Sequence, residues 1–590
     1  MTNEKVTVFS PRGITPPIHL IPMAPRLDTL DGKTIYIVDV NFPRTHQFLE
    51  EMQKLLTARY PKTTYILRTK VGSYFNNDPD LWAEIKEKGH GVIFGVGQLD
   101  TCAPSIIIFC SIMEKMGLPT APVITEAFAD LNRNFAYKKG IPKIRFTFVP
   151  HPFANRTIEV HRKYLEGNDP INGKPVIAGI VAALTKPITS EEKKTGTISR
   201  PNPRLLEPDT PQNLERYFLD SGWTDGLPII LPTQERVAEM LRGTSHKPDE
   251  IIGKMQPIPP NEAWERNVRQ LGAASRTANE TKSLPVTMQP SPPHEAWEYT
   301  VEHVAVNAVM AGARPEHFPV ILAIASTGVT SLFSSATSMC RMVVANGPIR
   351  KEINMNSGLS ALGPFNQANA VIGRAWTMIS KNLGGAKPGE TYLGDIGNNT
   401  NYNNLCCGEN EEALPEGWNP LHVQKGFKRE ESTISILGGW SILNYAAYKP
   451  YPHHEIMKEQ LTSFETSGAG THHTLGLNPG TQATFILSPV TAKDVTNEGF
   501  ATKEQLSRWI KENAFMSTWT YWAAMPDNLE AARKGVEPFA SWLKLPPGAK
   551  TKHPLINAAV EILVVGGGTD AFWMAADFNC MATASVDKWR

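Results

Sequence analysis

The sequence predicts an α/β protein in which a doubly wound parallel sheet near the N-terminus precedes a larger α/β or α+β part. Between residues 33 and 125, short β-branched runs alternate with segments whose apolar residues recur at helical spacing. This alternation stops at residues 189–212, which are rich in proline and have no apolar periodicity. Because strands separated by helices form parallel sheets covered on both faces, we expect ligands at the carboxyl ends of the strands, near the topological switch point.

Local sequence patterns predict the strands and helices of the N-terminal part. Residues 33–40 (KTIYIVDV) form a short β-branched run that predicts a buried strand. Residues 44–59 predict a helix because one face carries Phe48, Met52, Leu55 and Leu56. The same reasoning predicts strands at 63–71, 91–95 and 120–125 and helices at 79–88 and 105–116.

The second part of the chain is less regular. We expect a domain of residues 1–190, a linker at 191–210 and a C-terminal domain of residues 211–590, which could form two subdomains. A strand is predicted at 227–231, and helices are predicted at 213–219, 234–242, 295–311 and 365–383. Residues 384–439, rich in Gly, Asn and Pro, are either a functional loop region or contain strands that the pattern does not reveal.

Composition excludes several classes of protein. The chain has 590 residues, of which 59 are basic and 58 acidic, so its net charge of +1 gives no footprint for nucleic acid or a membrane surface. Its apolar runs are too short to span a bilayer, and six cysteines do not make a disulfide framework. We therefore expect a cytoplasmic protein with reduced thiols that acts on a small-molecule substrate, and a homo-oligomer is left open.

The clearest chemical signal is a cysteine placed between a strand and a helix. In the segment 92–105 (VIFGVGQLDTCAPS), Gly95 and Gly97 allow a tight turn, and Asp100 or Thr101 can cap a helix. Cys102 would then lie at a helix N-terminus, where unpaired N–H groups and the helix dipole lower the pKa of a thiol. Ser105 follows in a Cys-x-x-Ser arrangement. The alternative is that Cys102 is a small buried residue without chemistry, which is the better interpretation for Cys110.

Residues 95–102 resemble the signature of the UGSC family, named for selenocysteine-glycine-serine-cysteine. The resemblance covers roughly the first 190 residues and implies a thiol or selenol redox domain, distantly similar to the selenoprotein B subunits of glycine and D-proline reductases. Within the motif, Cys102 matches the final cysteine, Thr101 matches the serine, and Asp100 replaces the glycine. Leu99 stands where the selenocysteine or first cysteine belongs. Leucine cannot bond to Cys102, so this cysteine would act alone.

The C-terminal part resembles a family of bacterial and fungal proteins that occur as separate chains or fused to a UGSC-type domain. The segments that carry this resemblance are 222–228, 344–349, 356–364 and 406–411. A loop with Asn356, Gly358 and Gly363 leads into the predicted helix at 365, and such a helix start either binds a phosphate or carboxylate or is a plain loop and cap. Arg374 within this helix is either a ligand clamp or a surface residue.

Three further residues are candidates for catalysis. Cys406 could serve as a resolving thiol and Glu409 as a base, although a solvated acidic loop explains the same residues. His472 follows Gly468 and Gly470, which suggest a close backbone approach. No zinc-binding cysteine pairs are present, so metal ligands remain unknown; no cofactor is identified, and an external thiol or a metal could serve.

Two classes of function follow. The first is a cysteine-dependent enzyme that acts on a small electrophilic or sulfur-containing substrate, as a thiol-based reductase or a lyase. In the second, the C-terminal part runs a non-redox lyase or hydrolase reaction and the N-terminal domain binds a ligand, or the chain is a structural subunit of a complex. Activity of an isolated C-terminal fragment would favour the second class.

Overall fold

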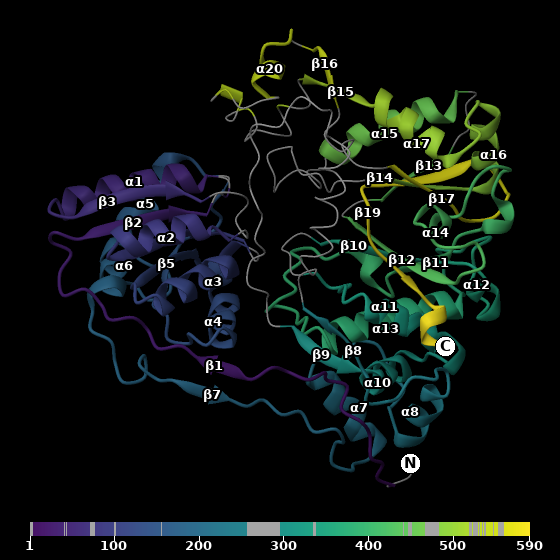
Figure 1. The fold of residues 1–590 in the computed structure, drawn as a ribbon, viewed down its shortest axis with the longest axis horizontal. Coiled ribbons are helices and arrows are strands. Elements are labelled where there is room, and N and C mark those ends of the chain that lie inside the picture. The colour runs from purple at the N-terminus through teal and green to yellow at the C-terminus, as the bar shows by residue number, and fades with distance from the viewer. Residues whose placement is uncertain are drawn as a thin grey trace.

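The computed structural model forms two bodies, drawn in purple to blue and in teal to yellow in Figure 1. It describes residues 4–590 with gaps at 41, 43, 71–76, 100–101, 155, 257–295, 334–337, 440–441, 447–450, 467–482, 519–521, 523–528, 530–531, 534, 536–538, 547 and 553–559. Within the described residues, no helix has both the length and the apolar character needed to cross a membrane.

The N-terminal body is built on a five-stranded, all-parallel sheet with the strand order β3-β2-β4-β5-β6. The strands are β2 (Thr34–Asp39), β3 (Thr64–Thr69), β4 (Gly91–Gly97), β5 (Thr120–Thr125) and β6 (Thr147–Val149). One face packs against α1 (Thr45–Arg59), α5 (Ile158–Glu166) and α6 (Val176–Thr185). The other packs against α2 (Pro79–Lys88), α3 (Cys102–Lys115) and α4 (Ala129–Lys138). The predicted doubly wound sheet is therefore confirmed.

Side-chain alternation explains the two covered faces. In β2, Tyr36 and Val38 lie in the core on the α2–α4 side, whereas Ile35 and Ile37 lie in the core on the α1 side. A strand that buries both faces reads as a continuous apolar run, which is why its position could be predicted. The direction in which strands are added reverses between β2 and β4, so the topological switch point lies at the carboxyl ends of these two strands.

Two extended segments join the bodies. Strand β1 (Ile18–Leu20) pairs antiparallel with β7 (Gly196–Ile198), which lies in the predicted linker (Figure 1). The residues before β1 pack on the larger body, where Val8 and Phe9 lie in its core. The residues around Phe9 therefore pack on the larger body, β1 leads from there into the N-terminal body, and β7 leads back to the larger body.

The larger body holds two four-stranded mixed sheets that face each other across a shared apolar core. The first, in the order β11-β10-β12-β19, comprises β10 (Cys340–Asn346), β11 (Leu405–Gly408), β12 (Thr433–Gly439) and β19 (Asn579–Ser585). The second, in the order β13-β18-β14-β17, comprises β13 (Ile442–Ala446), β14 (Ala483–Leu487), β17 (Val560–Val564) and β18 (Phe572–Ala576).

Helices cover the outer face of each sheet. The first sheet packs against α10 (Val301–Ala311), α11 (Phe318–Ser326) and α13 (Gln367–Asn382). The second packs against α15 (His453–Thr466), α16 (Pro489–Asn497) and α17 (Lys503–Asn513). The remaining elements are α7 (Pro211–Asp220), α8 (Gln234–Leu241), α12 (Ile349–Glu352), α14 (Leu421–Gln424), α20 (Phe539–Leu543) and the pairs β8 (Ile251–Met255) with β9 (Trp297–Thr300) and β15 (Phe515–Ser517) with β16 (Lys550–Lys552).

Three predictions for this body need correction. The strand predicted at 227–231 is wrong: this segment is irregular, and Pro228 and Pro232 deprive its backbone of donors. The helix predicted at 295–311 begins only at Val301, because Trp297–Thr300 forms β9 and Thr300 caps α10. The segment 384–439 contains β11 and all of β12, so the hidden-strand interpretation is the correct one from residue 405 onward.

Candidate active site

Cys102 begins α3 at the carboxyl edge of the N-terminal sheet. Its sulfur accepts hydrogen bonds from the backbone N–H groups of Gln98 and Leu99, with N–S distances of 3.3 and 3.2 Å. The Leu99 carbonyl, 3.6 Å from the sulfur, is the acceptor when the thiol carries its proton. Two N–H groups directed at the sulfur, at a helix N-terminus, favour the thiolate over the thiol.

The surroundings of Cys102 differ from the expected open turn. Its side chain is 0% exposed, and it lines neither the cavity of about 460 Å³ beside the connecting segments nor the one of about 670 Å³ next to α12. Ser105 is also buried, and Asp100 and Thr101 lie outside the described residues. A substrate can therefore reach the sulfur only if the residues around it move.

The glycines before Cys102 serve packing and not a turn. Gly95 and Gly97 both lie within β4, which is two residues longer than predicted. A Cβ atom on Gly97 would lie 2.8 Å from the Cβ of Ala103, which is closer than two non-bonded carbon atoms can approach. Gly97 thus lets the first turn of α3 pack directly on the strand, and this packing sets the position of Cys102. The turn predicted at Gly95 and Gly97 is therefore wrong, whereas their substrate-binding role stays a prediction.

An aspartate at the end of β2 organises polar side chains at the same edge. Asp39 is buried and accepts hydrogen bonds from the hydroxyls of Thr45 (2.5 Å) and Thr69 (3.2 Å). Its second oxygen lies 3.2 Å from Nδ1 of His46, whose side chain is 42% exposed. Nε2 of this histidine lies 3.4 Å from Glu50. A carboxylate that orients an accessible imidazole is a common acid–base arrangement.

Lys70 follows β3 and places a cation at this edge. Its side chain is 1% exposed, and its ammonium lies 5.7 Å from the ring centroid of Phe109, about two turns along α3 from Cys102. Burial lowers the pKa of Lys70 to about 7, against the attraction of Asp78 and Asp39. Such a lysine can both donate and accept a proton near neutral pH.

Sequence reasoning missed Asp39, His46 and Lys70. The available signal was a charged side chain that directly follows an apolar strand, as in IYIVDV and YILRTK. Because the carboxyl ends of parallel strands meet at one edge, these residues converge there although they lie far from Cys102 in sequence.

Cys406 does not approach Cys102. It lies in the larger body, in the core formed with α13, and burial raises its pKa to about 12. The expectation of a resolving thiol is therefore corrected, because this thiol stays protonated and lies in a different core. Cys407 and Cys110 are also buried thiols whose pKa is raised by burial.

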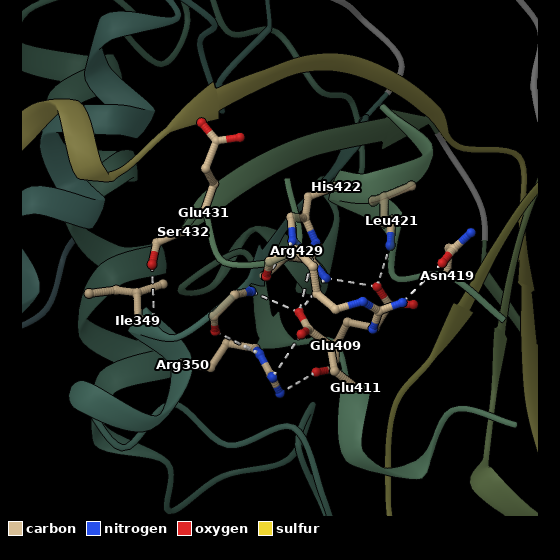
Figure 2. A network of polar contacts seen from close by, with 12 residues as sticks. Ile349, Arg350, Glu409, Glu411, Asn419, Leu421, His422, Arg429, Glu431 and Ser432 are labelled. Atoms are coloured by element: carbon tan, nitrogen blue, oxygen red, sulfur yellow. Dashed lines mark hydrogen bonds and ion pairs between the residues drawn. The ribbon is translucent and has the colours of Figure 1, made fainter. Parts of the chain in front are cut away.

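Glu409 is part of a buried polar network, shown in Figure 2, and the solvated-loop interpretation is wrong. One of its oxygens accepts from the Lys503 ammonium (2.5 Å) and more weakly from the Val564 N–H (3.4 Å). The other accepts from the Asn346 amide (2.8 Å) and the Leu421 N–H (2.7 Å). With its oxygens saturated in this way, Glu409 has no capacity left to act as a base. It joins β11, α14, α17 and β17.

Next to it, Glu411 and Arg350 extend the same network. Arg350 donates to the Glu409 carbonyl (2.7 Å) and pairs with Glu411 at 3.1 Å. Figure 2 shows Arg350 pointing toward both residues, with His422 on the opposite side of the two glutamates. Together, the contacts of Arg350, Glu409 and Glu411 fix the position of the residues that follow β11.

The loop before α13 is closed by its own side chains. The amide of Asn356 donates to Leu359 and to Asn366, and Asn369 donates to the Asn356 and Ala361 carbonyls, at 2.8–3.1 Å. The Gly358 N–H donates to the Asn356 side chain. These contacts, together with a hydrogen bond from the Asn366 amide to the Gly363 carbonyl, support the plain loop, although Asn366 makes no side-chain cap on α13.

Arg374 is neither a free clamp nor a surface residue. Its guanidinium makes two hydrogen bonds to the carboxylate of Asp225, at 2.7 and 2.9 Å, and a third to the Pro228 carbonyl. This half-buried pair fastens the segment 222–228 to α13. His472 lies outside the described residues. Within the described ranges, no group of three or more His, Cys, Asp or Glu side chains is arranged to hold a metal ion.

The N-terminal body is similar to a known protein family. Residues 7–167 match the model of the UGSC family. A search of curated proteins found no match. The matched range contains all five strands of the parallel sheet, the edge with Asp39 and Lys70, and the start of α3. The N-terminal body is therefore similar to the UGSC family over this range.

Proposed function

We propose that this protein is a cysteine-dependent enzyme whose active site is the carboxyl edge of the N-terminal sheet. Cys102 would attack a small electrophilic or sulfur-containing substrate. The observation that carries the proposal is the pair of backbone N–H groups, from Gln98 and Leu99, that donate to the sulfur at the start of α3. This arrangement favours a thiolate, which is the nucleophilic form of cysteine.

As a reductase, the protein would act by thiol–disulfide exchange. The Cys102 thiolate gives its electron pair to one sulfur of a substrate disulfide, so that a new S–S bond forms while the substrate S–S bond breaks. The departing sulfur keeps the released pair and takes a proton. An external thiol then attacks the mixed disulfide, is oxidised, and returns Cys102 to its starting state. An external thiol is needed because Leu99 cannot supply the second sulfur.

A lyase reaction uses the same nucleophile. The thiolate adds to an electrophilic carbon, a C–S bond forms, and the displaced electron pair moves to the neighbouring atom, which is protonated. When that atom gives its proton to a leaving group on the same carbon, the double bond re-forms and the bond to the leaving group breaks; water or an external thiol then takes the carbon from Cys102 and releases the thiolate. In both reactions a proton must be supplied at the sheet edge.

Lys70 and His46 are the groups that could supply this proton. Lys70, with its pKa of about 7, exchanges protons near neutral pH, and His46 is held by Asp39 and is accessible from outside. None of the six cysteines, all of which lie among the described residues, forms a disulfide, and we also propose a reducing location such as the cytoplasm, where Cys102 stays available for this chemistry.

Alkylation of the full chain with iodoacetamide at neutral pH tests the proposal. Peptide mass spectrometry would read the rate at each cysteine. We expect Cys102 to react roughly tenfold or more faster than Cys110, because the thiolate is the reactive form. Cys110 is a matched control, since it lies on the same helix and is equally buried. If both thiols react only as fast as the chain unfolds, Cys102 is inaccessible and the proposal fails.

A further inference from the structure

A cavity of about 460 Å³ lies where the two connecting segments meet the start of α10. Its walls come from the segment 9–17, around and before β1's first residue, from the segment 199–204, which follows β7, and from α10. Figure 1 shows both segments reaching the larger body near α7 and α10. Sites for small organic molecules have volumes of roughly 300–1,000 Å³, so this cavity is large enough to hold one.

Hydrogen bonds hold the walls of this cavity in place. The Thr15 hydroxyl donates to the Arg200 carbonyl at 2.7 Å, and the Asn202 amide donates to the Gly13 carbonyl at 2.6 Å. These two bonds join one connecting segment to the other. The Gly13 N–H donates to the Asn382 carbonyl of α13 at 3.0 Å, which fastens the first segment to the larger body. A cavity with walls fixed in this way is formed before a ligand arrives.

The lining of the cavity carries an excess of positive charge. Arg12, Arg200 and Arg204 contribute to it, and Glu302 is the one carboxylate among the described residues that line it. Arg204 makes two hydrogen bonds to Glu302, at 2.7 and 2.8 Å, so that this carboxylate already has its partner. Arg200 donates to the Pro16 carbonyl at 3.1 Å, which is a neutral group. The charges of Arg12 and Arg200 are therefore not balanced by Glu302.

Arg12 is the side chain with the most unused capacity. It is half-buried, and its guanidinium carbon lies 4.9 Å from the centroid of the Trp297 ring. Within the described residues, its guanidinium makes no hydrogen bond and no ion pair, which leaves its five N–H donors for water or a ligand. Burial lowers the pKa of Arg12 and of Arg200, and the charge of Arg12 lowers that of Arg200 as well. Two guanidinium groups that repel each other while partly removed from water favour an anion beside them.

Apolar side chains form another part of the lining. Phe9 and Val306 are buried in the core of the larger body and contribute to the wall of the cavity, and Ile14 lies beside them in the lining. Sites that combine apolar walls with a few directed polar groups bind organic molecules and orient them by the polar groups. The composition of the lining thus fits a ligand with an anionic end and an apolar part.

We infer that this cavity binds a small organic anion, whose carboxylate or phosphate group contacts Arg12 and Arg200 and whose apolar part contacts Phe9 and Val306. An oxyanion accepts paired N–H groups from a guanidinium and removes the repulsion between the two arginines. Because Arg12 and Arg200 belong to different connecting segments, the ligand bridges the two. The cavity does not include Cys102, so this inference is independent of the function proposed for the sheet edge.

Ligand-observed NMR titration of the full chain tests the inference, because saturation transfer detects weak binding. Sodium benzoate and phenyl phosphate are the probes, at constant ionic strength in sodium chloride. We expect at least one of them to bind, and the tighter probe identifies the anionic group. Acetate and inorganic phosphate should bind more weakly than the corresponding probe, because they have no apolar part.

Variants of the chain separate this cavity from other places where an anion could bind. Arg12→Met should raise the Kd of the tighter probe about tenfold or more, since it removes a charge-assisted pair of hydrogen bonds. Arg508→Met, which removes an exposed arginine of α17 outside the cavity, makes the same change in net charge and should leave the Kd unchanged. Arg12→Lys keeps the charge but loses the planar fork, so its Kd should lie between those of the native chain and Arg12→Met.

Three results would overturn the inference. They are the absence of saturation transfer to both probes, an unchanged Kd in Arg12→Met, and an equal loss of binding in Arg508→Met. Thermal unfolding without ligand shows whether each variant folds, and if Arg12→Met does not fold, Arg12→Lys decides: an unchanged Kd in that variant would equally contradict a role for the guanidinium.

Discussion

Two buried lysines in this protein are stabilised in different ways. Lys503 is paired with Glu409, and Lys70 is attracted by two aspartates. The first arrangement is structural, because the carboxylate is saturated. The second lysine has a pKa in the range used for proton transfer.

The pH dependence of stability tests the state of Lys70. Its folded pKa is lowered to about 7, below the value of roughly 10.4 for an unfolded lysine, so the unfolded chain binds more protons between these limits. Stability should therefore rise with pH through this window, by up to about 1.4 kcal/mol per pH unit from this group. Denaturant unfolding at several pH values should show a shallower rise in Lys70→Met. The exposed Lys88→Met is the control, and an equal slope in both variants would refute the lowered pKa of Lys70.

At the scale of elements, packing determines where the candidate site lies. The approach of α3 to β4 depends on Gly97, and Cys102 is fixed by that approach. We predict that Gly97→Ala lowers the free energy of unfolding by about 1–3 kcal/mol, because the added methyl group overlaps Ala103. Gly568→Ala has open space around its Cβ position and should change little. Equal stability of the two variants in chemical denaturation would contradict the assigned role of Gly97.

The buried pair of Glu409 and Lys503 links elements that are distant in sequence. Removing one partner leaves the other charged and buried, so Glu409→Gln and Lys503→Met should each cost about 3–5 kcal/mol. The double variant should cost less than the sum of the single variants. A double-mutant cycle measured by urea unfolding gives this coupling, and strictly additive losses would show that the pair is not a unit.

Elements whose pattern is local could be predicted, and those that depend on distant partners could not. The bounds of α2 and β5 are as predicted, since a proline-started amphipathic helix and a β-branched run need no outside information. The segment after Cys406 has the composition of a solvated acidic loop. The cation that neutralises it, Lys503, lies 94 residues away, so the local sequence does not reveal that the segment is buried. Likewise, Cys102 could be placed at a helix start, but its burial and the presence of Asp39 and Lys70 at the same edge of the sheet depend on the assembled fold.

At the scale of the whole molecule, the chain starts within the core of the larger body before it forms the N-terminal domain. Phe9 is buried in that core, next to α10, whereas Phe365 is 100% exposed. We predict that Phe9→Ala lowers the stability of the larger body by about 3–5 kcal/mol, whereas Phe365→Ala has almost no effect. Calorimetry would show the change. The predicted role of the first residues is wrong if Phe9→Ala unfolds as the native chain does.

We propose that the carboxyl edge of the N-terminal sheet holds Cys102 as its thiolate. A pH titration of the ultraviolet absorbance of thiolates, on the folded full chain, measures this directly. We expect one transition below the ordinary range of a thiol, lost in Cys102→Ala and retained in Cys110→Ala. A native chain without a transition in that range, or one whose transition survives in Cys102→Ala, would contradict it.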